Sequence, residues 1–439
     1  MAFAAAANPP PAPTSDSLRA VIALSTHGSR APAQDAATLC PANAANLNTY
    51  SVPFEQLTDK GMQQMVHAGA HTRDVYVESK HFLSPTLKKK THFDAYFRAD
   101  PSQSCGQSSV TFGYGLYPDS TSTTLGFPVP VPVVMQLLSN EHDIAVTHGP
   151  CRDTLDADVD NFDAHKGKDM LNAQASVLDQ LSTACGRPFD VTTSPSKDLS
   201  VISDMMHADA SQGLPSIFSP KLAIDVQTLA LNQMLGRYLG SPRQVTYYLG
   251  GFPNLMLSQL NQAASLTETS PYKLYAYTAH RHLLHGMGFL LGWNFHFDGE
   301  PKADEYNTTA LPAGTTLFIE LHTANDGADP VVETHIWSPE TIRTQVKLTK
   351  CSALACPLAE FNGIIDRHIQ LTTTWQELCQ YHPINQGSAN GVGTAGDDLA
   401  SSNYSLVLGA VLVALTLFAM HSAYTRINQF RRHSQYRPL

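Results

Sequence analysis

One stretch near the amino terminus constrains the fold most strongly. The mostly apolar run Val21–Ser25 predicts a buried strand, and the His27-Gly28 pair that follows one residue later predicts a break. A side chain directly after a strand lies at the carboxyl edge of a sheet, where open α/β sheets bind ligands. We therefore expect His27 to face a pocket beside Arg30, and the backbone amides of Gly28 and Ser29 to meet an anion. The alternative for this stretch alone is a histidine that merely ends a strand.

The same pattern of a strand and a polar corner recurs much later in the chain. Residues 273–279 predict a strand that runs into His280 and Arg281, and a helical segment follows. Further strands are predicted at residues 91–99, 315–322 and 334–337. Two histidines at strand ends, each close to an arginine, favour phosphoryl chemistry because arginine binds phosphate oxygens well.

Helical patterns dominate the middle of the chain. Residues 141–268 predict an inserted helical lobe, with helices around 166–185 and 222–240. Outside this lobe, residues 56–80 and 357–370 also predict helices. Residues 127–138 are apolar but interrupted by prolines, which indicates an edge strand or a connector.

Charge and histidine spacing exclude two classes of function. The net charge of −10 argues against nucleic acid as a partner, because phosphate-backbone binding needs a basic surface. The 19 histidines are scattered, and no H-E-x-x-H or comparable cluster gathers them. We therefore expect neither a metal nor a cofactor.

An apolar run close to the carboxyl terminus predicts membrane attachment. Residues 404–424 contain no acidic residue, lysine or arginine, and they are long enough to cross a bilayer about 30 Å thick. Arginines follow in residues 425–439, so we expect this tail to be cytoplasmic and the large domain to be luminal or extracellular. Residues 385–403 predict a flexible stalk before the span. In that compartment Asn307, which begins an Asn-Thr-Thr acceptor, would be glycosylated.

The amino terminus fits this topology poorly. Residues 1–16 are proline-rich, with only a short apolar run and no basic segment before it. We expect them to be the remnant of a signal peptide that starts upstream of Met1. The alternative is a tail-anchored protein whose domain lies in the cytosol.

Five motifs in the same order resemble those of the histidine acid phosphatases. The resemblance covers roughly residues 17–380 and implies an α/β core sheet with helices on both faces, an inserted helical lobe and a carboxyl-terminal transmembrane helix. The motifs, in chain order, are Thr26-His27-Gly28-Ser29-Arg30-Ala31-Pro32, Leu57-Thr58-Asp59-Lys60-Gly61, Thr278-Ala279-His280-Arg281, Glu320-Leu321 and Cys356-Pro357-Leu358-Ala359-Glu360-Phe361. The resemblance implies that His27 attacks phosphorus and that Arg30 and His280 hold the phosphate oxygens.

The sequence departs from the family pattern at three positions of the site. Thr26 stands where the family has an arginine before the nucleophile, and Ser104 where it has a second arginine. Arg281 replaces the acidic proton donor, and an arginine cannot donate a proton because its guanidinium stays protonated in proteins. Arg281 would instead add a positive charge for phosphate. Turnover would then need a proton from His282 or Asp100, or a leaving group good enough to need none.

The resemblance also bears on the cysteines, which lack any paired C-x-x-C motif. It pairs Cys351 with Cys356 and Cys151 with Cys379. Three others, Cys40, Cys105 and Cys185, remain with at most one further pair, which stays open. We expect Glu320 to be a strand carboxylate that faces solvent. We expect ordinary surface or helix-face histidines at His322, His282 and His285.

The sequence leaves two classes of function. One is a membrane-anchored acid phosphatase that hydrolyses small phosphate esters through a phosphohistidine. The other is a catalytically impaired relative, a pseudophosphatase that binds an anionic ligand or serves as a surface or sorting protein. The terminal Tyr436-Arg437-Pro438-Leu439 resembles the tyrosine sorting signal of lysosomal acid phosphatase, which implies an endosomal or lysosomal location, or the cell surface, and a sorting adaptor. A homodimer is left open.

Overall fold

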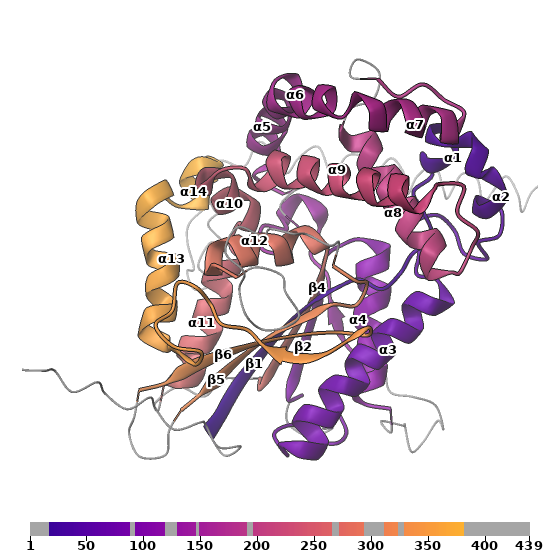
Figure 1. Ribbon diagram of the computed structural model, residues 1–439. Helices are drawn as coiled ribbons and strands as arrows, with labels where there is room; N and C mark the ends of the chain where they lie inside the picture. Colours follow the sequence, from indigo (N-terminus) through magenta and orange to yellow (C-terminus); the bar gives the residue numbers. More distant parts are fainter. Residues whose placement is uncertain are drawn as a thin grey trace, which may run out of the picture. The chain divides into compact units, whose positions relative to one another are not determined.

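Strands from distant parts of the chain meet in one mixed sheet (Figure 1). The structure, a computed structural model, describes residues 17–87, 93–118, 130–145, 149–190, 196–265, 272–293, 311–323 and 329–381. Within these residues the strand order is β3-β2-β4-β1-β5-β6-β7, and β8 pairs with β6. The strands are β1 (Leu18–Thr26), β2 (Ala95–Ala99), β3 (Val133–Val134), β4 (Leu274–Ala279), β5 (Thr316–His322), β6 (Val331–Ser338), β7 (Thr341–Gln345) and β8 (Cys356–Pro357).

The direction of the strands places three segments at one edge of the sheet. Strand β4 is parallel to β1 on one side and to β2 on the other, whereas β5, β6, β7 and β8 pair antiparallel. Thr26 of β1 lies opposite Ala279 of β4, and Ala99 of β2 lies opposite Thr278. The residues that follow these strand ends therefore emerge side by side.

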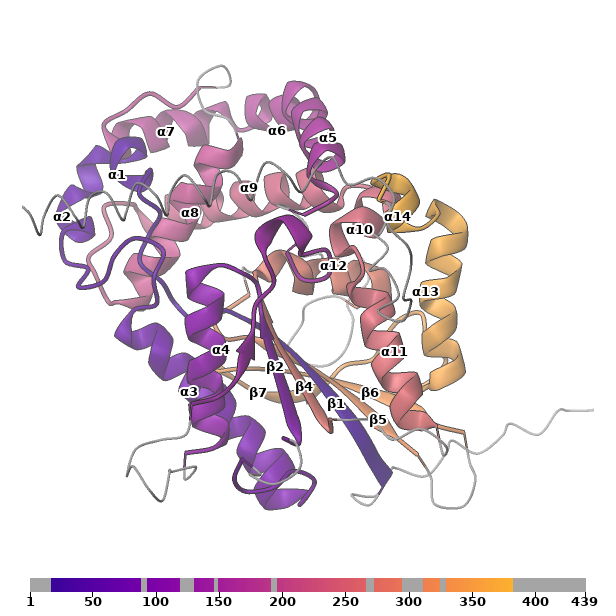
Figure 2. The ribbon, with the colours of Figure 1, turned by 180° about the vertical axis from the view of Figure 1, so that it is seen from behind.

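Helices cover both faces of the sheet because the central strands β1, β4 and β5 are buried at nearly every residue, and successive side chains of a strand point to opposite faces. Ile22 and Leu24 of β1 pack in one core with helices α10–α13, while Val21 and Ala23 pack in a second core with α3 and α4 (Figures 1 and 2). These helices are α3 (Asp59–Arg73), α4 (Gln103–Leu116), α10 (Pro242–Leu249), α11 (Phe252–Ala264), α12 (Arg281–Leu291) and α13 (Leu358–Thr372), and α14 (Trp375–Leu378) packs beside α10.

A helical lobe with its own core lies beyond the edge where these three segments emerge (Figure 1). It contains α5 (Arg152–Ala164), α6 (Lys166–Ala173), α7 (Ala175–Cys185), α8 (Ser196–Ser211) and α9 (Pro220–Leu239), together with the short helices α1 (Ala36–Leu39) and α2 (Ala44–Leu47). The predicted range 141–268 is mostly helical where the structure describes it, but the lobe ends at α9, because α10 and α11 pack in the core against the sheet. The lobe also recruits residues 36–47 from the segment after β1.

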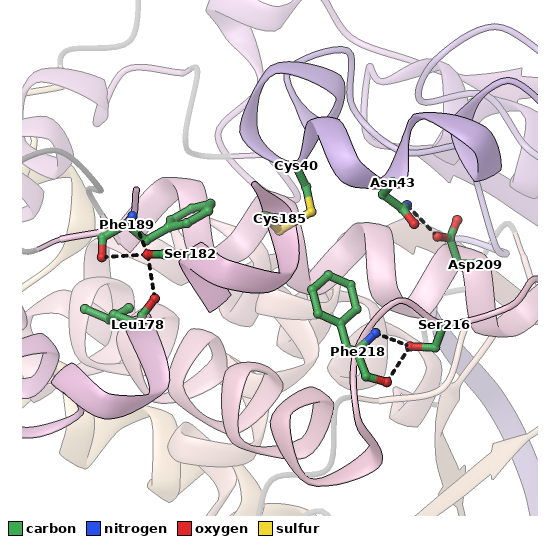
Figure 3. The surroundings of a disulfide bond; sticks show 9 residues. All are labelled: Cys40, Asn43, Leu178, Ser182, Cys185, Phe189, Asp209, Ser216 and Phe218. Carbon is green, nitrogen blue, oxygen red and sulfur yellow. Dashed lines mark hydrogen bonds between the residues drawn. A yellow bond between two sulfur atoms is a disulfide. The ribbon is translucent and has the colours of Figure 1, made fainter. Parts of the chain in front are cut away.

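Two contacts hold that early segment on the lobe. A disulfide joins Cys40 to Cys185 at the end of α7 (Figure 3). Asp209 on α8 accepts hydrogen bonds from Asn43 (2.7 Å), Asn46 (2.9 Å) and the Tyr50 hydroxyl (2.8 Å). Helix α8 is therefore fixed to the chain segment that leads out of the His27 loop.

Several predicted elements differ in extent from the observed ones. The helix predicted over 56–80 ends as α-helix at Arg73 and continues as a π-helical turn, Asp74–Ser79. The helix predicted over 166–185 breaks at Gln174, where φ is −117°. The strand predicted over 91–99 begins at Ala95. Apolar spacing locates these elements but does not fix their ends, which depend on local hydrogen bonds.

The disulfides expected from the resemblance, Cys151–Cys379 and Cys351–Cys356, are both present, and the open pairing resolves as Cys40–Cys185 with Cys105 reduced and buried. Among the helices of the described ranges, none has the length and apolar character needed to cross a bilayer. The predicted leader 1–16, Asn307, the stalk 385–403, the span 404–424 and the tail with Tyr436 and Leu439 lie outside the described residues.

The expectation that Glu320 and His322 face solvent is wrong. Glu320 is fully buried and His322 is 3% exposed, because both point into a polar cluster between the sheet and the π-helical turn. His285 is also fully buried, within α12. Alternation along a strand predicts an exposed position for Glu320, but its charge is matched by partners far away in the sequence.

Candidate active site

Three strand ends place polar side chains next to one another. The backbone N–H of His27 donates to the carbonyl oxygen of Ala279 (3.2 Å), and that of Asp100 donates to Thr278 (2.9 Å). His280 follows β4 as the N-cap of α12. The rings of His27 and His280 consequently meet edge to face, with centroids 5.2 Å apart.

Helix α3 holds the loop that carries His27. Thr58, the N-cap of α3, donates its hydroxyl to the carbonyl of Ser29 (3.1 Å) and accepts from Gly61 N–H (3.1 Å). A Cβ on Gly28 would lie 2.4 Å from the Gly61 carbonyl oxygen, and one on Gly61 would lie 1.9 Å from that of Ser29. The two glycine-containing motifs therefore pack backbone against backbone, which larger residues would prevent.

The expectation that the Gly28 and Ser29 amides meet an anion is wrong. The Gly28 N–H donates to Ser108 Oγ (3.1 Å), and the Ser29 N–H donates to Gln64 Oε1 (2.9 Å). Both acceptors lie on helices that pack against the loop. The two amides therefore hold the loop in place and are not available to an anion. Cationic side chains must supply any anion binding.

The geometry of His27 favours a neutral nucleophile. Its Nδ1 lies 2.8 Å from the carbonyl oxygen of Gly28, and because a carbonyl only accepts, Nδ1 carries the proton and Nε2 the lone pair. Burial, followed by the charge of Arg30 and by His280, lowers the pKa of His27 well below its usual value near 6.5. The ring thus stays neutral in mildly acidic solution.

Two arginines and one carboxylate form the charged part of the site. Arg281, at the first position of α12, lies 2.5 Å from Oδ1 of Asp204, and Arg30 lies 3.7 Å from Oδ2. Arg30 also pairs with Glu55 at 3.2 Å. Burial alone would raise the pKa of Asp204, but the charges of Arg281 and Arg30 lower it to about 2. Asp204 therefore forms ion pairs with both arginines.

Helix α8 supplies residues that sequence reasoning missed. Besides Asp204, it places His207 at the cavity wall, and burial with the charge of Arg281 lowers the pKa of His207 to about 4. No motif surrounds Asp204, and its ionic partner lies 77 positions away. The one signal in the sequence is Arg281 itself, because an arginine in place of an expected acid needs a carboxylate nearby to balance its charge.

The substituted positions have other partners. Thr26 lines the cavity, and its hydroxyl lies 3.4 Å from the Pro312 carbonyl. Ser104 is 1% exposed, and it is absent from the described residues that line the cavity. Arg98, just before that loop, is buried in ion pairs with Glu141 (2.7 Å) and Asp143 (2.8 Å). Arg98 therefore does not replace the missing arginine.

Asp100 lies behind His280 rather than in the cavity. Its Oδ1 accepts from the Ser102 N–H (2.9 Å) and lies 3.8 Å from His280 Nε2. Burial and the two arginines lower the pKa of His280, whereas Asp100 and Asp204 oppose that shift. Asp100 thus orients the His280 ring and partly stabilises its protonated form.

One group at the site has the side-chain types of a metal centre. Ligand atoms of Asp100, Cys105 and His280 all lie within 4.8 Å of one another. Cys105 is fully buried, and its burial raises the pKa of the thiol, which disfavours the thiolate that a metal would require. The arrangement therefore fits a metal poorly.

The side chains surround a cavity of about 630 Å³. Besides His27, His280, Arg30, Arg281 and Asp204, its walls include His207, His282, Gln64, Ser200, Pro312, Glu340 and Thr341. Burial and neighbouring cations lower the pKa of His282 well below its usual value, so this histidine is also neutral in mildly acidic solution. The cavity thus combines neutral imidazoles with two arginines, as covalent transfer of an anionic group requires.

A comparison with protein-family models gives a match over most of the chain. A family model described as histidine phosphatase superfamily (branch 2) matches residues 17–336. A comparison with curated protein sequences finds no match.

Several solved structures share the fold. The phytase of Citrobacter braakii is 17% identical over 80% of this chain and 98% of its own, with a TM-score of 0.59. The apo phytase of Hafnia alvei is 16% identical over 83% and 98%, with a TM-score of 0.60. The multiple inositol polyphosphate phosphatase of Bifidobacterium longum is 12% identical over 83% and 94%, with a TM-score of 0.51. At these identities the likeness is one of fold.

Proposed function

Because this chain belongs to branch 2 of the histidine phosphatase superfamily, we propose that it hydrolyses phosphate monoesters at acidic pH through a phosphohistidine on His27. The observation that carries the proposal is the state of His27. Its Nδ1 donates to the Gly28 carbonyl at 2.8 Å, which leaves the lone pair on Nε2, and the ring borders the same cavity as Arg30, His280 and Arg281. A neutral imidazole among cations is suited to attack an anionic phosphorus centre.

The proposed reaction has two steps. His27 Nε2 forms a bond to phosphorus while the bond from phosphorus to the ester oxygen breaks, and the electron pair leaves with that oxygen. Water then attacks the phosphohistidine, which breaks the N–P bond and releases inorganic phosphate. Arg30 and Arg281 would offset the charge on the phosphoryl oxygens, and His280 would donate a hydrogen bond to one of them.

Known ligands of the structural neighbours support an anionic substrate. The Hafnia alvei phytase has been solved with myo-inositol hexakis sulphate and with tartrate, and the Bifidobacterium longum phosphatase with inositol hexasulfate. The cavity of this chain contains two arginines but also Asp204 and Glu340. Because these charges balance, we propose a small ester with one phosphate rather than a polyphosphate.

The pH dependence of the full-length protein tests the proposal. With 4-nitrophenyl phosphate, kcat/KM should stay high from about pH 6.5 down to about pH 5, because the lowered pKa of His27 keeps the nucleophile neutral there. With a substrate whose phosphoryl group is radiolabelled, the phosphoenzyme trapped in alkali should carry that label on His27. Arg30→Gln should move the acidic limb towards pH about 6.5, because a cation that lowers the His27 pKa is lost. Activity without a labelled histidine would refute the mechanism.

A second candidate function rests on the same charges. Arg281 stands where an acid is expected, so the motif lacks its proton donor while two arginines remain to bind an anion, which favours binding without turnover. Calorimetry with inorganic phosphate separates the two functions. Binding of phosphate together with absent turnover of every ester tested would support this candidate.

We also propose that residues 404–424 anchor the protein in a membrane with its large domain luminal or extracellular. The support is the uncharged run, the arginines after it and the Asn307 acceptor. Endoglycosidase treatment of the expressed protein should increase its electrophoretic mobility, and Asn307→Gln should remove that shift. An unshifted wild-type protein that remains in the cytosol would favour the tail-anchored topology.

A further inference from the structure

Asp204 lies where two cavities meet. The cavity of about 630 Å³ that contains His27 adjoins a second one of about 470 Å³. The two share Arg30, Ser200, Asp204 and His282 in their walls. The second cavity contains Met234, Tyr238 and Lys197, a mixture suited to the organic part of an ester. A substrate with phosphorus beside His27 would therefore place its leaving group across this boundary.

The carboxylates of the two cavities differ in position. Among the described residues, Glu340 borders the His27 cavity alone, whereas Asp35 and Glu55 border the second cavity alone. Asp204 is the carboxylate that borders both. It is thus placed beside the bond that breaks between phosphorus and the leaving oxygen.

We propose that Asp204 is the general acid of the reaction, a role that rests on the proposed function. It would supply from helix α8 the proton that Arg281, at the start of α12, cannot supply. The carboxylate is on α8, the arginine is on α12, and the pair is 2.5 Å apart. This arrangement keeps an acidic group in the cavity although the sequence motif has lost it.

Contacts with the rest of the fold hold Asp204 in position. Five residues further along α8, Asp209 is anchored by Asn43, Asn46 and Tyr50. Gln212, just after the helix, donates to the Thr58 hydroxyl (2.9 Å), which caps α3 beneath the His27 loop. The helix that carries the acid is therefore tied to the loop that carries the nucleophile, as a positioned proton donor requires.

The two rival donors are less suited to the role. Asp100 is 6% exposed and is absent from the described cavity lining, because it lies behind His280. His282 borders both cavities, but its neutral ring in this cationic site is a very weak acid. Asp204, with 32% of its side chain exposed, reaches the cavity and has a carboxyl group.

The substrate itself brings the proton. A phosphate monoester near pH about 5 is mostly a monoanion, since its second pKa is about 6. When its oxygens pair with Arg30 and Arg281, Asp204 loses the cationic neighbours that keep it ionised and takes the ester's proton. Asp204 then gives this proton to the leaving oxygen as the bond to phosphorus breaks. In the second step its carboxylate accepts a proton from the attacking water.

A leaving-group series in the full-length protein tests the proposal. Asp204→Asn keeps the shape and a hydrogen bond to Arg281 but cannot donate a proton. Its kcat/KM should fall less than about 10-fold for 4-nitrophenyl phosphate, whose leaving group needs no proton, and about 10²- to 10⁴-fold for an alkyl phosphate. Asp204→Glu should recover part of the alkyl phosphate activity. The control Glu340→Gln removes the other carboxylate of the His27 cavity and should affect both substrates equally.

Several outcomes would overturn the proposal. An equal loss with both substrates would assign Asp204 a structural role. A gain with both would mean that its carboxylate merely competes with phosphate for the arginines. If the wild-type protein turns over neither ester, the proposed function fails and the role of Asp204 fails with it. If the wild type is active and Asp204→Asn shows no dependence on leaving group, this proposal fails alone.

Discussion

Replacing His27 with alanine should abolish turnover, with kcat/KM falling by about 10⁴-fold or more. The imidazole forms the covalent intermediate in the proposed mechanism, and no other described side chain in the cavity has its geometry. Its Nδ1 proton is fixed by the Gly28 carbonyl, and its ring meets His280 at 5.2 Å. Steady-state kinetics with 4-nitrophenyl phosphate at about pH 5 would measure the loss.

A matched variant distinguishes a lost nucleophile from a disturbed cavity. His207→Ala removes another neutral histidine from the same wall, and we expect it to cost about 10-fold or less. Inorganic phosphate should still bind to His27→Ala, because Arg30 and Arg281 remain. Wild-type-like turnover in His27→Ala would show that a different residue performs the attack.

Parts of the site could be predicted because they depend on local patterns. An apolar run that ends in a polar corner marks a strand end, and two such ends in parallel neighbouring strands must meet at one edge of a sheet. The pattern therefore predicts that His27 and His280 lie close together, although they are far apart in the sequence. The strand register places Thr26 opposite Ala279, so the two histidines that follow emerge side by side.

Other parts depend on contacts that no local pattern records. Asp204 is one of several polar residues on α8, and nothing in its spacing separates it from those that face solvent. The prediction that the amides of Gly28 and Ser29 meet an anion is wrong because both already donate to side chains, Ser108 and Gln64, on helices packed behind the loop. The sequence shows which groups are available, whereas the tertiary structure decides which of them are already bonded.

The cysteines illustrate the same limit. The pairing of Cys40 with Cys185 spans 145 positions and joins an early loop to the helical lobe. It could not be chosen over a pair with Cys105, because that choice depends on the lobe packing against residues 36–47. This disulfide also matters for the site, because it helps to fix the lobe that carries Asp204.

Removing the buried charge of Glu320 should destabilise the fold by about 3–5 kcal/mol. This carboxylate is fully buried and accepts hydrogen bonds from Tyr76 (2.7 Å) and Lys80 (2.9 Å), and it also pairs with Arg343 and His322. Glu320→Ala would leave these donors, two of them cationic, without their shared acceptor. Chemical denaturation at about pH 7 would measure the change in the free energy of unfolding.

The pH dependence of the loss identifies its electrostatic origin. Burial alone would raise the pKa of Glu320, but the hydrogen bond from His322 and the charges of Arg343 and Lys80 lower it well below its usual value. A carboxyl whose pKa is lowered by folding stabilises the protein above its unfolded pKa of about 4.3 and loses that contribution as pH falls towards the folded value. The difference in stability between wild type and Glu320→Gln should therefore be constant from about pH 7 to about pH 5 and shrink at lower pH. Glu333→Gln, at a partly exposed carboxylate beside His335, is the control and should cost about 1 kcal/mol or less. A difference that does not change at low pH would mean that packing, rather than the charge of Glu320, stabilises this cluster.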